Sequence, residues 1–211
     1  MSLLPVLRFA VVAAALGSLF ALLFLVWRTH SAGRSPNLAL PRASAGRGVL
    51  YAFTTGMMPW EKESAARHLP TFLAGIVYHA GILGLFCYVL SLVLFHASSP
   101  RLLFVQPLMA AGAVAGIGLL IKRAVKPHLR ALSIGDDFVS NALVDVCLIL
   151  AVSHWHFQRL EAALLSAFLL LLIYAPLGKI RHCFFFFYTR ILFGAFFGRR
   201  GVFPGPQRLT R

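Results

Sequence analysis

One histidine of this chain, His79, stands in the middle of an apolar run that extends from residue 71 to residue 90. An ionisable side chain at membrane depth is costly, so it is normally retained because it binds something or lines a polar path. Glycines flank it at positions Gly75, Gly81 and Gly84, and glycine lets a flat macrocycle lie close to a helix backbone. The pattern indicates an axial ligand of haem iron. The alternative is a core histidine that bonds to a serine or to a backbone carbonyl.

A b-type haem that is held by the protein alone needs two axial ligands at similar depth on facing helices. The best second ligand is His182, which follows the last strongly apolar turn before the tail. If the preceding helix continues through Pro176, a tilt or a kink at that proline brings His182 to the depth of His79. The remaining histidines are expected to be solvated or to lie at the membrane interface, with His68 as a reserve ligand: His30, His68, His96, His128, His154 and His156.

A second ionisable residue, Asp145, lies within another apolar segment, where a carboxylate is also a functional candidate. Asn141 precedes it by four residues and therefore shares its helix face. Three interpretations stay open. Asp145 is a proton acceptor beside a bound quinol, a hydrogen-bond acceptor that orients a haem-ligating imidazole, or a neutral acid bonded to Asn141 or Ser140.

The elements that must position these residues are membrane-spanning helices. Hydrophobic residues make up 59% of the 211 positions and only six residues are acidic, and the mean hydropathy of +0.81 far exceeds that of a soluble domain. The net charge of +14 does not indicate nucleic acid, because the cations lie between the apolar runs. Runs of about twenty apolar residues each cross a bilayer as a helix. The sequence predicts an all-α, five-helix transmembrane bundle in one domain, with spans near residues 5–27, 69–96, 102–121, 136–153 and 160–178.

The distribution of lysine and arginine predicts the orientation of this bundle. Six of them lie in residues 28–67, four in the loop 122–130 and seven in the tail 179–211, and these segments fall on one side of a five-span topology. The opposite side has three. Positive loops face the cytoplasm, so we expect the N-terminus outside, the C-terminus in the cytoplasm and His79 in the cytoplasmic half of its span.

Basic residues near the inner ends of the spans are candidates for binding haem propionates, because arginine pairs well with carboxylates at a membrane edge. The alternative is that they are ordinary positive charges of the cytoplasmic side. These candidates are Arg123, Arg130, Lys179 and Arg181. The tail that follows, residues 182–211, mixes phenylalanines with arginines, which is typical of a segment in the membrane interface or of a docking surface for a cytoplasmic partner.

Three segments together resemble a known family. Residues 78–86, Tyr-His-Ala-Gly-Ile-Leu-Gly-Leu-Phe, resemble the second helix of the gamma subunit of respiratory nitrate reductase. They are also similar to the cytochrome b membrane subunits of heterodisulfide-reductase-like and sulfite-reductase-associated complexes. The basic loop 122–137 resembles the one that precedes the fourth helix of that family. Residues 175–182, Ala-Pro-Leu-Gly-Lys-Ile-Arg-His, resemble the element that follows its fifth helix.

This resemblance implies that His79 and His182 ligate the haem nearer the cytoplasm. It also implies an outer haem, and here the chain departs from the family pattern. The outer ligands would fall at Val89 and Leu164, whose apolar side chains cannot bind iron. We therefore expect one haem b. A displaced outer haem held by His96 with His154 or His156 is the weaker alternative.

The predicted function is that of a b-type cytochrome subunit in the inner (cytoplasmic) membrane. It would anchor a partner complex and pass electrons between the quinone pool and that partner. The family resemblance implies that the partner is an iron–sulfur subunit at the cytoplasmic face. Whether the chain itself oxidises quinol or reduces quinone stays open, and a quinone site near Asp145 and the haem is to be considered. The alternative is a haem-free membrane scaffold or a small transporter, in which His79 and Asp145 line a polar path.

Overall fold

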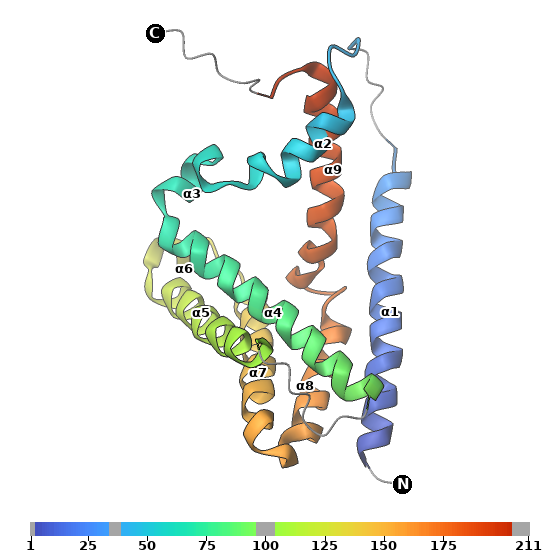
Figure 1. Ribbon diagram of the computed structural model, residues 1–211, viewed down its shortest axis with the longest axis vertical. Helices are drawn as coiled ribbons and strands as arrows, with labels where there is room; N and C mark the ends of the chain where they lie inside the picture. The colour runs from blue at the N-terminus through green and yellow to red at the C-terminus, as the bar shows by residue number, and fades with distance from the viewer. Residues whose placement is uncertain (1–2, 34–38, 96–103, 204–211) are drawn as a thin grey trace. The chain divides into compact units, whose positions relative to one another are not determined.

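The computed structural model describes residues 3–33, 39–95 and 104–203, and every regular element within these ranges is a helix. The predicted all-α fold class is thereby confirmed for the described part of the chain. Five of its helices are long and apolar enough to cross a membrane, so the chain is a multi-pass membrane protein (Figure 1). They are α1 (Leu3–Ser31), α4 (Leu69–Phe95), α5 (Val105–Val125), α7 (Gly135–His156) and the helical stretch Lys179–Arg200.

The fifth of these helices differs from the one that the sequence predicts. Residues 160–178, the expected fifth span, contain helix α8 (Glu161–Tyr174) of 14 residues. At 1.5 Å per residue this helix is about 21 Å long, which is shorter than a hydrocarbon core of about 30 Å. The helix ends before Pro176, which has no N–H group to continue the hydrogen-bond ladder. The chain then forms η4 (Lys179–Arg181) and α9 (His182–Arg200), so the tail is a long helix instead of the continuation expected through Pro176.

The chain divides into two compact units. The first unit consists of Met1–Leu22 and Pro70–Arg181, and the second consists of Leu23–Leu69 and His182–Arg211. The first unit thus contains α4, α5, α7 and α8 with the beginning of α1. The second contains α9, the end of α1 and the segment that follows it.

Helices α4 and α5 of the first unit approach each other at small residues. A Cβ atom added to Gly112 would lie 2.7 Å from the Cα atom of Gly81, and one added to Gly84 would lie 3.3 Å from the side chain of Met109. Such close contact is the common use of small residues between membrane helices. Gly112 and Gly116 of α5 both lie where an added Cβ atom would overlap a neighbouring helix. Gly81 and Gly84 were expected to let a macrocycle approach the helix. In the structure they lie against α5 instead.

The interior of the first unit is apolar and continuous. It includes Leu85 and Leu92 of α4, Leu148 of α7 and Leu164 of α8, all of them fully buried. Burial of one such leucine contributes about 2 kcal/mol relative to water. Because lipid is also apolar, the helices are held chiefly by packing and by the polar contacts described below.

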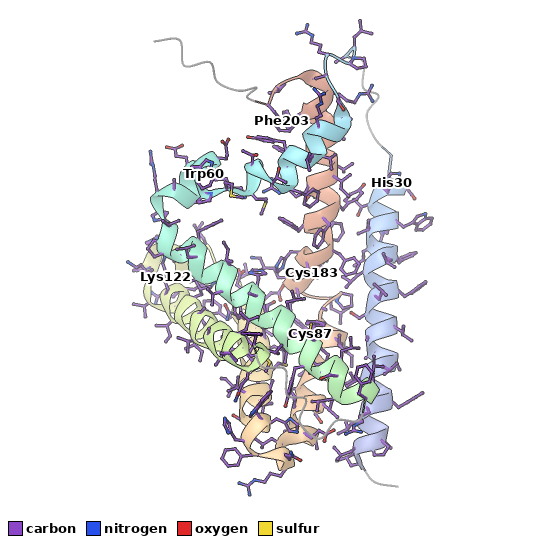
Figure 2. All side chains as sticks on the ribbon, in the orientation of Figure 1. His30, Trp60, Cys87, Lys122, Cys183 and Phe203 are labelled. Atoms are coloured by element: carbon purple, nitrogen blue, oxygen red, sulfur yellow. The ribbon has the colours of Figure 1, made fainter. Side chains whose placement is uncertain are left out.

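The second unit is built on the close packing of α2 (Ala45–Phe53) against α9. A Cβ atom on Gly198 would lie 2.7 Å from the Cα atom of Gly48, and Gly194 also meets the α2 backbone. Phe203, labelled in Figure 2, packs on Tyr51 of α2 with 4.5 Å between ring centroids. Between α2 and α4 the chain forms three short helices, which are η1 (Thr55–Met57), η2 (Pro59–Glu61) and α3 (Glu63–Arg67).

Candidate functional site

His79 lies on an exposed face of α4. Its Nδ1 atom is 2.7 Å from the carbonyl oxygen of Gly75, one turn earlier, and its ring meets the edge of the Tyr78 ring with 6.1 Å between centroids. A Cβ atom added to Gly75 would meet nothing within 4 Å. The side chain therefore has the carbonyl bond of the alternative interpretation, yet it is not part of the core.

His182, the other predicted iron ligand, is the first residue of α9 and is also exposed. It belongs to the second unit, whereas His79 belongs to the first. Their pairing on one iron atom stays a prediction. The two side chains share one property, which is that neither is buried within its helical unit.

Asp145 is the centre of a polar cluster in the first unit. Its side chain is 3% exposed, and its Oδ2 atom accepts a hydrogen bond of 2.8 Å from the side-chain amide of Asn141. The same amide nitrogen lies 3.2 Å from the Tyr78 hydroxyl and 3.3 Å from the Gly116 carbonyl oxygen. The Tyr78 hydroxyl in turn donates to the backbone carbonyl of Asn141 over 3.3 Å. The cluster therefore links α4, α5 and α7. Ser140, the other predicted partner, donates to Asp136 instead.

The second oxygen of Asp145 is buried without a hydrogen-bond partner. It lies against Gly116 so closely that a Cβ atom at that position would overlap it. No ion pair within residues 3–33, 39–95 and 104–203 includes Asp145. A buried carboxyl oxygen without a donor or a cation is unusual, because most buried polar atoms are bonded.

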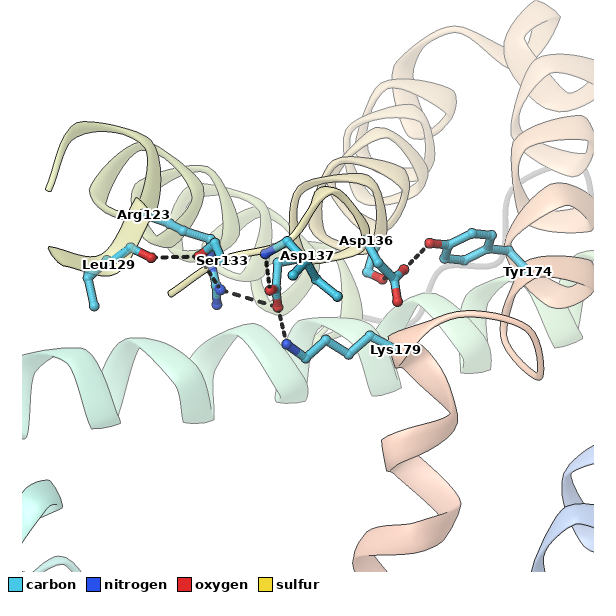
Figure 3. Close-up of polar contacts among 9 residues, drawn as sticks. Arg123, Leu129, Ser133, Asp136, Asp137, Tyr174 and Lys179 are labelled. Atoms are coloured by element: carbon cyan, nitrogen blue, oxygen red, sulfur yellow. Dashed lines mark hydrogen bonds and ion pairs between the residues drawn. The ribbon is translucent and has the colours of Figure 1, made fainter. Parts of the chain in front are cut away.

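Two of the predicted propionate ligands are engaged by the protein itself. The Arg123 guanidinium lies 3.2 Å from the Oδ1 atom of Asp137, and the Lys179 ammonium contacts the same oxygen (Figure 3). The Asp137 side chain is 4% exposed. Its other oxygen accepts a 3.1 Å bond from the backbone N–H of Ile134 and so caps the start of α7. Arg123 and Lys179 thus join α5 and η4 to α7 through one carboxylate.

A neighbouring contact holds the end of α8. The Tyr174 hydroxyl donates to Asp136, which also accepts a 3.1 Å bond from Ser140 (Figure 3). The other two predicted propionate ligands, Arg130 and Arg181, are exposed. Within the part of the chain that the structure describes, neither of them forms an ion pair.

The sequence analysis missed one buried residue, a histidine that it expected at the membrane interface. His154 is 0% exposed, its Nδ1 atom lies 2.8 Å from the Tyr88 hydroxyl, and its Nε2 atom is buried without a partner. Close by in the sequence, Glu161 accepts bonds of 2.6 and 3.0 Å from the Arg8 guanidinium. The sequence carried a signal, because apolar residues recur at helical spacing at Val144, Cys147, Leu148 and Ala151, and the same face of α7 includes position 154.

The positions that the sequence analysis discussed for an outer haem lie in environments that differ from one another. Val89 and Leu164 are 1% and 0% exposed and belong to the core. His156 lies 3.2 Å from the side-chain amide nitrogen of Gln106, and His96 lies outside the described residues. One haem rather than two stays a prediction.

The described residues contain no group of three or more histidine, cysteine, aspartate or glutamate side chains arranged to hold a metal ion. A b-type haem is compatible with this, because its iron takes only two ligands from the protein. The exposed His79 ring beside the open position at Gly75 fits such a cofactor. Comparison of this chain with protein-family models, with curated proteins and with solved structures finds no match.

Proposed function

We propose that this protein is a b-type cytochrome of the cytoplasmic membrane, similar to the gamma subunit of nitrate reductase. It passes electrons between membrane quinone and a redox partner, an iron–sulfur subunit, at the cytoplasmic face. His79 and His182 are the axial ligands of one haem. The observation that carries the proposal is the exposed imidazole of His79 on a membrane-spanning helix.

The energetics of the bilayer support this role for His79. A polar ring on the outer face of a membrane helix is costly unless a cofactor or another element covers it. The 2.7 Å contact between Nδ1 and the Gly75 carbonyl requires the proton on Nδ1, which puts the lone pair on Nε2. Haem-ligating and metal-ligating histidines commonly have this arrangement. Gly75 keeps the adjacent turn free of a side chain.

The positive charges at the start of α7 and around η4 support the expected position of the propionates. Arg130 and Arg181 carry charges that no described carboxylate neutralises. Arg123 and Lys179 are shared with Asp137, so we assign them a structural role first and propionate binding second. The aromatic and basic helix α9 is the proposed docking surface for the redox partner.

The test is an optical spectrum of the purified full-length chain. We expect a reduced-minus-oxidised b-type band and one haem per chain by pyridine haemochrome assay. His79→Ala and His182→Ala should each abolish the band. His128→Ala is the matched control, because His128 is an exposed histidine on the short helix α6 (Pro127–Ala131), and it should keep the band. A stable, colourless wild-type protein would rule out the cytochrome.

A second candidate function is a haem-free scaffold or small transporter, and the buried carboxyl of Asp145 is the observation that favours it. A transporter uses intramembrane carboxyls to bind protons or ions. In that case Asp145→Asn should abolish transport in proteoliposomes, while the purified chain shows no haem band. The spectrum thus separates the two candidates.

A further inference from the structure

Three polar residues of α7 lie at intervals of four positions, Asp137, Asn141 and Asp145. Residues four apart lie on one face of a helix, so these side chains form a line that leads from the first turn of α7 into its apolar middle. Asp137 is neutralised by Arg123 and Lys179. Asp145, at the inner end of the line, has no cation near it among the described ion pairs.

The surroundings of Asp145 are shaped around its carboxyl group. Gly116 leaves the space that the Oδ1 atom takes up, since any side chain there would overlap it. The Asn141 amide is shared among the Asp145 Oδ2 atom, the Tyr78 hydroxyl and the Gly116 carbonyl. The Tyr78 hydroxyl proton is used by the Asn141 carbonyl. The Oδ1 atom of Asp145 is buried and has no hydrogen-bond partner.

We propose that Asp145 is a proton-binding site that takes up one proton when one electron reaches a haem held by His79. This inference rests on the proposed function. It assigns to the chain the coupling of electron transfer to proton uptake inside the bilayer. The ligand of the site is a proton, carried on the Oδ1 atom that has no other partner.

The physical reason is the cost of an unpaired charge in a medium of low dielectric constant. An ionised carboxyl buried without a cation or a full set of donors is strongly destabilised. Ferric iron in a porphyrin with two neutral imidazoles carries a net positive charge, and one electron removes it. The positive charge of the oxidised haem stabilises the ionised carboxylate, and this stabilisation is lost on reduction.

The balance of the step is simple. A quinol would supply one electron, which would reduce the iron from the ferric to the ferrous state, and the quinol would become a neutral semiquinone as it releases one proton to the aqueous phase. One proton from the aqueous phase binds Oδ1 of Asp145, so the net charge of the site does not change. One O–H bond forms, and reoxidation by the partner releases the same proton.

The contacts of the first unit connect this carboxyl to the proposed iron ligand. Tyr78 precedes His79 on α4, the two rings lie 6.1 Å apart, and the Tyr78 hydroxyl belongs to the Asp145 cluster. The other titratable side chain of α7 in this region is Cys147, which is fully buried. From α5, the residue that faces the carboxyl is Gly116, which has no charge. Asp145 is thus the one carboxyl of this cluster.

The experiment is a redox titration of the purified holoprotein over a range of pH. In the wild type we expect the midpoint potential to fall as the pH rises, with a slope near one proton per electron. Asp145→Asn should reduce that slope to near zero and keep the haem band. Asp136→Asn, a carboxyl of the same helix bonded to Ser140 and Tyr174, is the matched control and should keep the slope.

A second measurement observes the proton on the carboxyl group directly. The reduced-minus-oxidised infrared difference spectrum of the wild type should contain a carboxylic acid C=O band that shifts in deuterium oxide. That band should be missing in Asp145→Asn and present in Asp136→Asn. If the haem is present but the wild-type potential does not depend on pH, or if Asp145→Asn keeps the slope, the inference is wrong and the cytochrome stands. If no haem is found, the proposed function itself fails.

Discussion

Two histidines in long helices of the first unit differ in almost every respect. His79 is exposed on α4 and bonds to a carbonyl of its own helix. His154 is fully buried on α7 and bonds to a tyrosine of α4. A ring with a local bond is held in place on the exposed face of its own helix. A ring bonded across two helices joins them, and its loss damages the interior.

The same contrast separates two glycines. Gly75 borders the exposed His79 ring and has open space where a side chain would be. Gly116 is pressed against Asp145 and Tyr78 in the interior. A side chain added at Gly75 would therefore meet nothing within 4 Å, whereas one added at Gly116 would overlap Asp145 and Tyr78. Three experiments with substituted chains test this contrast.

The largest difference in stability is expected between His154→Ala and His79→Ala. His154→Ala should lower the free energy of unfolding by about 2–4 kcal/mol, because it opens a cavity and leaves the Tyr88 hydroxyl unpaired. His79→Ala should change it by less than about 0.5 kcal/mol, as exposed substitutions usually do. Denaturant unfolding of the haem-free chain in detergent micelles measures both. Equal losses would contradict the comparison.

A smaller effect is expected from Gly116→Ala, for which Gly118→Ala is the control on the same helix. The new methyl group at position 116 would overlap Asp145 and the Tyr78 ring, so we expect a loss of about 1–3 kcal/mol. At position 118 a Cβ atom meets nothing within 4 Å, and no loss is expected. Unfolding of the two variants under the same conditions checks this. Equal behaviour of both variants would argue against close packing at Gly116.

A small effect on stability of the opposite sign is expected from Gly75→Ala. Alanine is the better residue in a helix interior, so the haem-free chain should become more stable by about 0.5–1 kcal/mol. The haem content of the same variant should fall, because the methyl group would enter the space assigned to the macrocycle. Unfolding and pyridine haemochrome assays on one preparation measure both quantities. An unchanged haem content would place the macrocycle elsewhere.

Part of this architecture could be predicted from local sequence. The spans at α1, α4, α5 and α7 follow from apolar runs of sufficient length, because the bilayer requires each of them to be a continuous helix. The exchange of the fifth span for a short α8 and a long α9 was not predicted, since hydropathy says little about where a Pro-Leu-Gly segment ends a helix.

The candidate site could also be predicted only in part from the local sequence. The sequence indicated Asp145 and its bond to Asn141 because four-residue spacing is a local property of a helix. It did not indicate that Tyr78 and Gly116 complete the cluster, that Asp137 engages Arg123 and Lys179, or that His154 is buried. Each of these depends on which faces of different helices meet.

The amino-acid sequence alone determined that this chain is helical, that it is built for a bilayer, and which residues are too polar for their place in it. Tertiary packing decided which of those residues turn inward and which turn outward. The reason is physical: an apolar run must become a helix in lipid whatever its neighbours are, but all sides of such a helix look alike to lipid. Contacts between helices, made by glycines and by a few polar atoms, determine which side of a helix packs against its neighbours.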